Sequence, residues 1–148
     1  MEPKRAGAEK VEGTTIAQSA IEGISAVSLA THDMTRAVRF YRALGFTVRY
    51  GGEASSFTSF HAGSCYLNLI AQRAARQWSW WGRVIFYVTK VDAFYVRAVT
   101  AGLQPDSAPQ DAAWGERFFH LTDPDGHELS FATPSSAATA TLTDGTDC

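Results

Sequence analysis

The segment AAWGERFFHLTDPDGHELSFATP, residues 112 to 134, brings several side chains that could do chemistry into one short stretch. Imidazole and carboxylate groups are ligands that borderline metals such as zinc accept, so a metal site is the first interpretation to test. A catalytic hairpin and the wall of a binding pocket are the alternatives. The side chains concerned are His120, Asp123, Asp125, His127 and Glu128.

The tetrapeptide DPDG in this segment has the composition of a tight turn. Proline at its second position and glycine at its fourth suit turn geometry, and aspartate side chains can accept hydrogen bonds from their own backbone. Asp123 and Asp125 are therefore predicted to form a turn rather than to bind a ligand. His127 begins the strand that leaves this turn and is predicted to face solvent.

His120 and Glu128 stay as weak catalytic candidates. His120 lies in the middle of a predicted strand, where it either lines a pocket or is a structural histidine with its hydrogen bonds satisfied. Glu128 could pair with a cation, lie exposed at a rim or act as a general base. The sequence has no serine or cysteine triad and no phosphate-binding loop that would assign a reaction.

The composition is that of an ordinary globular protein. The chain has 148 residues, enough for one domain or for two small repeated units that share a core. A net charge of -2 without a basic run argues against a nucleic-acid partner. No stretch approaches the roughly 20 apolar residues of a membrane span, and the first residues lack the apolar core of a secretory signal, so we expect a cytoplasmic protein.

Cysteine usage does not indicate a disulfide framework. Cys65 lies in the apolar run CYLNLI, and Cys148 is the last residue of the sequence. We expect a buried structural thiol at Cys65 and a loose thiol at Cys148, because free cysteine is among the residue types that are most often buried.

The first half of the chain predicts a strand, a helix and three further strands. Polarity alternates along the first strand, with Val27 and Leu29 on one face. Asp33 is a suitable N-cap for the helix, and Gly45 suits the left-handed backbone position that closes it. The predicted strands are 23–33, 46–52, 56–63 and 65–72.

The second half predicts the same series again. Asp92 is the expected cap of a helix from Phe94 to Ala101, and Gly102 is its stop. Corresponding residues of the two halves lie a constant 57 positions apart, which indicates an internal duplication. The corresponding pairs are Leu29 and Phe86, Val38 and Tyr95, and Gly45 and Gly102. The predicted strands are 82–90, the vicinity of 103–105, 116–123 and 127–133.

These elements give two βαβββ modules in tandem within one domain, residues 23–134. The linker between the modules carries three of the four tryptophans, Trp78, Trp80 and Trp81, and we expect them to cover part of the protein. Polar, small residues at both ends of the chain predict flexible tails. The boundaries are 1–22 for the N-terminal tail or arm, about 24–71 for module 1, 72–82 for the linker, about 83–134 for module 2 and 135–148 for the C-terminal tail.

Such a tandem resembles the vicinal oxygen chelate superfamily, which includes glyoxalase I, extradiol dioxygenases, fosfomycin-resistance proteins and the bleomycin- and mitomycin-binding resistance proteins. The motifs HDMTRAVRFYRALGF and LTDPDGHELSF are similar to that family's first helical segment and closing hairpin. The resemblance covers roughly residues 24 to 134. It implies an α+β fold in which the modules form a curved mixed sheet around a central cleft, and it is strongest for the metal-free bleomycin- and mitomycin-binding members.

The resemblance also implies where a metal ion would bind in metal-dependent members of the family. There, one side chain from the first strand and one from the last strand of each module hold a divalent cation. The corresponding residues here are poor ligands, since alanine has no donor atom, asparagine and serine are weak neutral ligands, and arginine repels a cation. We therefore expect no metal and no other cofactor. The positions are Ala26, Asn68, Arg83 and Ser130.

Alternate side chains of a strand point to the same face of the sheet, and we call this alternation strand parity. Strand parity and the resemblance together predict a small-molecule site in the cleft, where small side chains leave room for a ligand. Trp114 in DAAWGERFF is similar to the tryptophan that edges the drug site in the bleomycin- and mitomycin-binding members. Flat rings could stack on it and on Trp80, Trp81, Phe57 or Phe60, although ordinary core packing is the alternative for each. The predicted ligand-binding residues are Ser28, Phe60, Tyr66, Asn68, Arg83, Tyr87, Trp114, Glu128 and Ser130.

Arg83 is the most informative residue of that set. A guanidinium in a cleft must be paired, because an unpaired buried charge costs several kcal/mol. Arg83 either forms an ion pair with Glu128 or Glu116, or it receives an anionic group of a ligand.

Three functions remain open at this point. The first is a metal-free protein that sequesters a planar aromatic, antibiotic-like small molecule. The second is an enzyme, either a glyoxalase-like lyase, thiol transferase or dioxygenase with atypical metal ligands, or a metal-free acid/base catalyst that uses Glu128 or His120. The third is a structural or regulatory partner that binds a peptide or nothing. The resemblance further implies a homodimer whose grooves form between protomers, with the N-terminal residues as a swapped arm.

Overall fold

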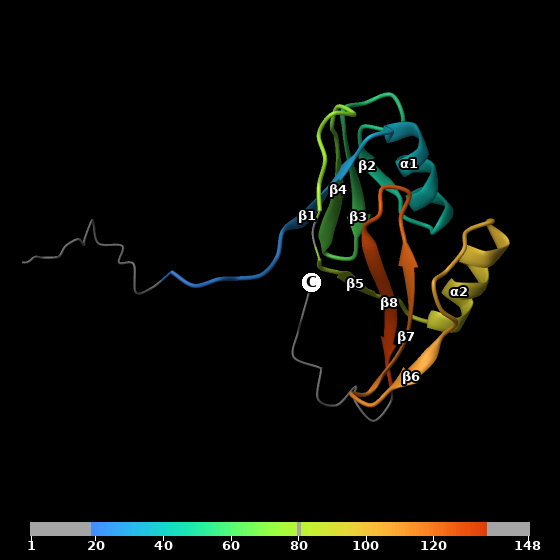
Figure 1. The fold of residues 1–148 in the computed structure, drawn as a ribbon. Coiled ribbons are helices and arrows are strands. Elements are labelled where there is room, and N and C mark those ends of the chain that lie inside the picture. Colours follow the sequence, from blue (N-terminus) through green and yellow to red (C-terminus); the bar gives the residue numbers. More distant parts are fainter. Residues whose placement is uncertain (1–18, 80, 136–148) are drawn as a thin grey trace, which may run out of the picture.

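Each half of the chain folds into a four-stranded sheet with one helix packed against it (Figure 1). The computed structural model describes residues 19–79 and 81–135. The prediction of an α+β fold with two βαβββ modules is confirmed. Neither helix within the described ranges is long and apolar enough to cross a membrane. Most of the two predicted tails lies outside the described residues.

Module 1 is a mixed sheet with the strand order β1-β4-β3-β2. Strand β1 runs parallel to β4, and the other two pairings are antiparallel. Asp33 caps α1 as predicted, because its side chain accepts a hydrogen bond of 3.0 Å from the backbone N–H of Arg36. Gly45 follows the helix with a φ of 102°, a conformation that strains residues with a β-carbon. The elements are β1 (Ala26–Thr31), α1 (Met34–Ala43), β2 (Val48–Tyr50), β3 (Phe57–Ala62) and β4 (Cys65–Ala71).

Module 2 repeats this arrangement with the order β5-β8-β7-β6 and with β5 parallel to β8. Helix α2 begins 57 positions after the start of α1 and ends 57 positions after its end, which is the offset of the sequence repeat. Gly102 follows α2 with a φ of 88° and so corresponds to Gly45. The elements are β5 (Val84–Tyr87), α2 (Val91–Thr100), β6 (Gln110–Ala112), β7 (Glu116–Thr122) and β8 (Glu128–Pro134).

The prediction that Asp92 caps α2 is wrong. The helix already begins at Val91, and its N-cap is Lys90, which makes no side-chain capping bond. The Asp92 carboxylate instead accepts hydrogen bonds of 3.0–3.2 Å from the guanidinium of Arg117 on β7. Arginine meets this carboxylate through two nitrogens, and such a bidentate ion pair is among the strong hydrogen-bonded contacts of a carboxylate.

The strand predicted near 103–105 is also wrong. The N–H of Leu103 donates to the carbonyl oxygen of Ala98 at 3.0 Å and so completes the end of α2. That backbone group is therefore not available for a sheet, and the outer strand of module 2 forms later in the chain, at β6.

Cys65 is buried as expected, but it is not a free thiol. Its side chain is 6% exposed and is disulfide-bonded. The expectation of a free thiol at this position is therefore wrong. Cys148, for which a loose thiol was expected, lies outside the described residues.

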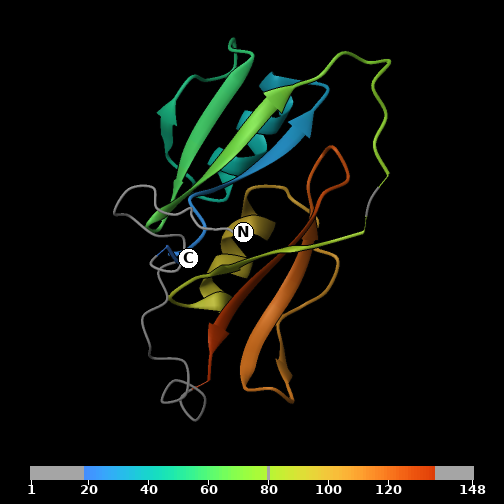
Figure 2. The same cartoon turned by 90° about the vertical axis from the view of Figure 1, so that its left-hand side faces the viewer.

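Each sheet buries one face under its helix and turns the other face away, and in Figure 2 the strands lie in front of the helices. We call the second face of both sheets the open face. Strand residues directed at the helices are almost fully buried, whereas their neighbours on the open face, such as Ser28 and Ile85, are exposed. The predicted strand parity is confirmed. The buried positions include Leu29, Leu67, Leu69, Leu129 and Phe131.

The two modules share one hydrophobic core. Phe46, which follows α1, packs edge-on against Phe86 of β5 with 5.2 Å between the ring centroids. Phe86 in turn stacks on Phe131 of β8 at 5.5 Å. Because aromatic rings from both modules interlock, the two sheets cannot rotate independently without losing buried contacts.

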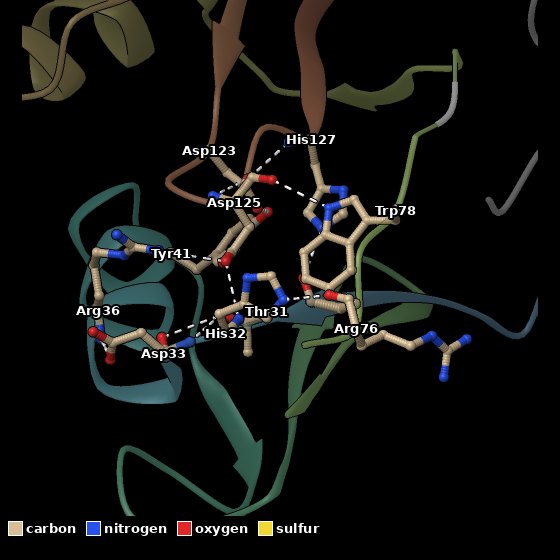
Figure 3. A network of polar contacts seen from close by, with 11 residues as sticks. Thr31, His32, Asp33, Arg36, Tyr41, Arg76, Trp78, Asp123, Asp125 and His127 are labelled. Atoms are coloured by element: carbon tan, nitrogen blue, oxygen red, sulfur yellow. Dashed lines mark hydrogen bonds and ion pairs between the residues drawn. The ribbon is translucent and has the colours of Figure 1, made fainter. Parts of the chain in front are cut away.

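A buried hydrogen bond joins the modules at the DPDG turn (Figure 3). The hydroxyl of Tyr41 on α1 donates to Oδ2 of Asp123 at 2.7 Å. Oδ1 of the same carboxylate accepts from the backbone N–H groups of Asp125 and His127, both at 2.9 Å. Burial raises the pKa of Asp123 above its usual value, and the hydrogen bonds from Tyr41 and His127 offset only part of this rise. Asp123 is a turn former as predicted, and it also fixes the turn to module 1.

His127 is buried, so the prediction that it faces solvent is wrong. Its ring is covered by Trp78 of the linker, which stacks on it at 5.9 Å, and its Nε2 shares a hydrogen bond of 2.7 Å with the Ala30 carbonyl oxygen. Trp78 also contacts the ring of His32 at 4.2 Å (Figure 3). Trp78 therefore covers the junction, as expected for a linker tryptophan. Trp81 is 85% exposed, so the expectation that it covers part of the protein is wrong, and Trp80 lies outside the described residues.

We predict that Tyr41→Phe lowers the free energy of unfolding by about 1–3 kcal/mol, because it leaves a buried carboxylate oxygen of Asp123 without its donor. Tyr95→Phe is the matched control, since within the described residues the Tyr95 hydroxyl makes no hydrogen bond and its ring packs on Phe119 at 5.3 Å. Urea unfolding of both variants measures the difference. Equal losses in the two variants would contradict a special role for the Tyr41 hydroxyl.

Candidate functional site

The open face of module 2 holds most of the predicted site residues. Strand pairing places Ile85 opposite Ser130, Tyr87 opposite Ala132 and His120 opposite Ser130. Ser130 and Ala132 on the central strand are nearly buried, at 3% and 1% exposed. The larger side chains of β5 and β7 therefore stand on both sides of a strand with small residues.

Arg83 forms an ion pair with Glu128 at the edge of this face. Its Nη2 lies 2.8 Å from Glu128 Oε1, and both side chains are partly exposed. The sequence left three possible partners for Arg83, namely Glu128, Glu116 and an anionic group of a ligand. The structure pairs it with Glu128. The guanidinium of Arg83 is therefore already paired in the protein without a ligand.

The other family metal positions hold no carboxylate, imidazole or thiolate. Ala26 and Asn68 lie on adjacent strands of module 1, and Asn68 donates a hydrogen bond of 3.2 Å to Ser28 Oγ. Among residues 19–79 and 81–135, no three His, Cys, Asp or Glu side chains are grouped so that they could hold a metal ion. The residues at the family's metal positions thus do not fit a divalent cation.

His120 is held in the sheet by Ser130. Its Nδ1 shares a hydrogen bond of 2.7 Å with Ser130 Oγ, and its ring lies 5.0 Å from that of Phe118. Burial, and then the positive charge of Arg83, lower the pKa of His120 below its usual value. These effects favour the uncharged imidazole, and the position of His120 fits both interpretations offered by the sequence.

An aromatic group, which we call the aromatic platform, occupies the other end of the module 2 open face. It consists of Tyr87, Trp114 and Phe118, with Trp114 stacked on Phe118 at 5.7 Å between centroids. Tyr87 is 55% exposed and Trp114 69% exposed, which is unusual for such large rings. Both rings are oriented by Glu116, which accepts hydrogen bonds from Trp114 Nε1 at 3.0 Å and from the Tyr87 hydroxyl.

The module 1 half of the open face is more polar. Tyr66 lies under the guanidinium of Arg49, whose carbon is 4.1 Å from the ring centroid. Arg49 also donates to Ser59 Oγ at 3.4 Å. Tyr66, Asn68 and Ser28 are therefore on the face where the sequence placed them, but each already has a partner or neighbour within its own module.

Phe60 is not on this face, so its prediction as a ligand-binding residue is wrong. It pairs with Leu67 across β3 and β4, so it shares the direction of Leu67 toward the core. It is fully buried and contacts the rings of Tyr41 and Phe46. Phe57, three residues earlier, has the opposite parity and does point toward the open face.

Phe118 belongs to the site although it is not among the predicted residues, and Glu116 has a different role from the one predicted. Both residues lie on β7 with the same parity as His120, two and four positions before it. Extending that parity toward Trp114 would have found them. The sequence predicts Glu116 only as a possible partner for Arg83, because it contains no signal that Tyr87 and Trp114 converge on one carboxylate.

Comparison with known proteins agrees with this architecture. A family model described as the Glyoxalase/Bleomycin resistance protein/Dioxygenase superfamily matches residues 23–131. A glyoxalase/bleomycin resistance protein/dioxygenase from Nocardioides has a similar structure, with a TM-score of 0.65 and 21% identity over 81% of this chain and 88% of that chain. A bleomycin resistance determinant encoded on the transposon Tn5 has a TM-score of 0.63 and 22% identity over 76% of this chain and 98% of that chain. At these identities the likeness shows the fold alone.

A curated relative is matched over a shorter stretch. The uncharacterized protein Rv0887c from Mycobacterium tuberculosis (strain ATCC 25618 / H37Rv) is 43% identical over 47 residues. The match covers 32% of this chain and 28% of that protein, so it spans less than a third of the relative's length. It assigns no activity.

We predict that Tyr87 titrates at unusually high pH. The hydrogen bond to Glu116, followed by burial, raises its pKa from about 10 to about 12. Because the pKa is raised in the folded state, the stabilisation is fully present below pH 10 and is lost as the pH rises through about 12. Ultraviolet titration should show that Tyr87→Phe removes phenolate absorbance appearing near pH 12. Loss of a component near pH 10 instead would contradict the Glu116 contact.

Proposed function

The chain belongs to the Glyoxalase/Bleomycin resistance protein/Dioxygenase superfamily, and on this premise we propose that it is a metal-free protein that sequesters a planar aromatic, antibiotic-like small molecule. The ligand lies on the open face of module 2 and stacks on the aromatic platform. The binding protein needs no covalent step, so it needs neither a nucleophile nor a metal centre.

The observation that carries this proposal is the exposed aromatic platform. Large rings of a folded protein are normally buried, and a cluster of exposed ones is typical of a binding surface. Glu116 restrains Trp114 and Tyr87, so less side-chain entropy is lost when a flat ligand binds. Each ring stacked on the ligand adds roughly 0.5–1.5 kcal/mol beyond the burial of area.

The residues at the family's metal positions support the metal-free part of the proposal. A divalent cation bound there would meet the guanidinium of Arg83 and would have no donor from Ala26. Glu128, the nearest carboxylate to Arg83, is already neutralised by it at 2.8 Å. Binding a metal would therefore require breaking this ion pair and leaving Arg83 unpaired.

We further propose that the protein is a homodimer in which the second copy covers the remainder of the open face. Exposed aliphatic and aromatic side chains such as Ile85, at 61% exposed, support this arrangement. A partner covering them would also exclude water from a ligand on the platform, and apolar burial is the main favourable term in association.

His120 favours an enzyme as the second candidate function. Burial and the charge of Arg83 lower its pKa and so favour the uncharged ring, and its Nδ1 shares a hydrogen bond with Ser130, so it could accept a proton from a bound substrate. The corresponding reactions are metal-free acid/base catalysis, or a glyoxalase-like lyase, thiol transferase or dioxygenase reaction with atypical ligands. The aromatic platform favours binding over these reactions because none of its members is an acid or base at neutral pH.

We predict that Trp114→Leu weakens the binding of flat neutral aromatics such as 9-acridone by about 2- to 12-fold, because one stacked ring is lost. Trp81→Leu is the matched control, since Trp81 is also exposed but lies on the linker, away from the platform. Fluorescence quenching and thermal shift measure the affinities. Equal losses in both variants would contradict the platform.

Metal analysis of the purified protein distinguishes a metal-free binding protein from a metal-dependent enzyme. Elemental analysis of the purified protein should find well below one equivalent of divalent metal, and 9-acridone binding should survive a chelator. About one tightly held equivalent, lost in His120→Ala or Glu128→Gln together with an activity, would establish the enzyme instead.

We predict a dimer in size-exclusion chromatography with light scattering, and we expect Ile85→Asp to convert it to a monomer by placing a charge in the apolar contact. Val96→Asp is the control, because Val96 is similarly exposed, at 59%, but lies on α2 on the opposite side of the sheet. A wild-type monomer, or equal effects of the two substitutions, would contradict the shared open face.

A further inference from the structure

The charges on the module 2 open face are not balanced. Arg83 and Glu128 neutralise each other at 2.8 Å. Arg117 points to the helix side of β7 and pairs there with Asp92 and Asp111. Within the part of the chain that the structure describes, Glu116 pairs with no Lys, Arg or His side chain. One uncompensated negative charge therefore remains in the middle of the aromatic platform.

The contacts of Glu116 leave it able to bind a further donor. Each of its oxygens accepts one hydrogen bond, Oε1 from Trp114 and Oε2 from Tyr87. An ionised carboxylate offers about four lone-pair sites, so roughly two remain free. The carboxylate is half-buried between the two rings, where water screens its charge less than at a fully exposed site.

The surrounding rings add to the attraction for a cation. The face of an aromatic ring carries a negative quadrupole, and a cation over the face of tryptophan or tyrosine is stabilised by about 0.5–2 kcal/mol. Trp114 and Tyr87 are both exposed, but they point their N–H and O–H edges at Glu116, so a cation bound to the carboxylate gains this stabilisation only where it reaches over an exposed ring face. An anionic group would be repelled by the same arrangement.

We propose that Glu116, Trp114 and Tyr87 form a subsite for a cationic amino group, so that the ligand is a planar aromatic compound that carries a protonated amine. This inference rests on the proposed function and specifies its ligand class. The rings of the ligand stack on Trp114, and the ammonium group donates hydrogen bonds to the free lone pairs of Glu116.

A matched pair of probes tests the subsite. 9-Aminoacridine is a flat cation at pH 7, and 9-acridone is a neutral ring system of similar shape. The wild-type protein should bind 9-aminoacridine more tightly than 9-acridone. Glu116→Gln keeps an oxygen acceptor in place but removes the charge, so it should weaken 9-aminoacridine by about tenfold and change 9-acridone by less than about threefold.

Asp111→Asn controls for the loss of one negative charge elsewhere on module 2. Its carboxylate pairs with Arg117 at 3.2 Å on the helix side of the sheet, so both probes should bind as in the wild type. Raising the salt concentration of the wild-type protein from about 50 mM to about 500 mM should weaken 9-aminoacridine selectively, because screening acts on the charged contact. This second measurement does not depend on any variant folding.

The outcomes separate the two proposals. Equal weakening of both probes in Glu116→Gln shows that Glu116 only orients the rings, and it overturns the cationic subsite. Wild-type binding of 9-acridone as tight as that of 9-aminoacridine, or binding of both without salt dependence, overturns the subsite but leaves the aromatic binding function in place. If neither probe binds the wild-type protein, the proposed function fails, and the subsite fails with it.

Discussion

The hydrogen bond between the Tyr41 hydroxyl and the Asp123 carboxylate is the contact on which the arrangement of the two modules depends. It is buried, it joins α1 to the turn before β8, and it shares its carboxylate with two backbone N–H groups of that turn. A buried carboxylate without its donors would cost several kcal/mol. The turn can therefore form only where Tyr41 reaches it, and this fixes where the open face of module 2 lies relative to module 1.

The linker and the neighbouring turn residue reinforce this contact from the outside. Asp125 accepts a hydrogen bond of 3.0 Å from the His32 backbone, and Trp78 lies between the rings of His32 and His127 (Figure 3). These groups come from both modules and from the segment that joins them. The junction is thus built from polar and aromatic contacts, which leaves the strand faces on the opposite side free for another role.

Much of the fold followed from the sequence because its signals are local and repeated. Asp33 caps its helix and Gly45 closes it through contacts with residues a few positions away, and the 57-residue offset recurs in both helices. Phe60 faces the core because it pairs with Leu67 across β3 and β4, a register that the prediction did not apply to it. His127 is buried because Trp78, far along the chain, covers it. Polarity patterns carry no information about which distant side chain will cover a position.

The sequence predicts which side chains share the face of the candidate site, because strand parity determines the face to which each strand residue points. Parity places Tyr87, His120 and Ser130 on one face, and the structure puts them there. Parity does not determine how side chains on that face pair with each other. Arg83 meets Glu128 while Glu116 meets two aromatic donors, and this difference in partners decides where charge remains. A neutral ion pair and an uncompensated carboxylate lie on the same small sheet, so the face distinguishes ligands by charge as well as by shape.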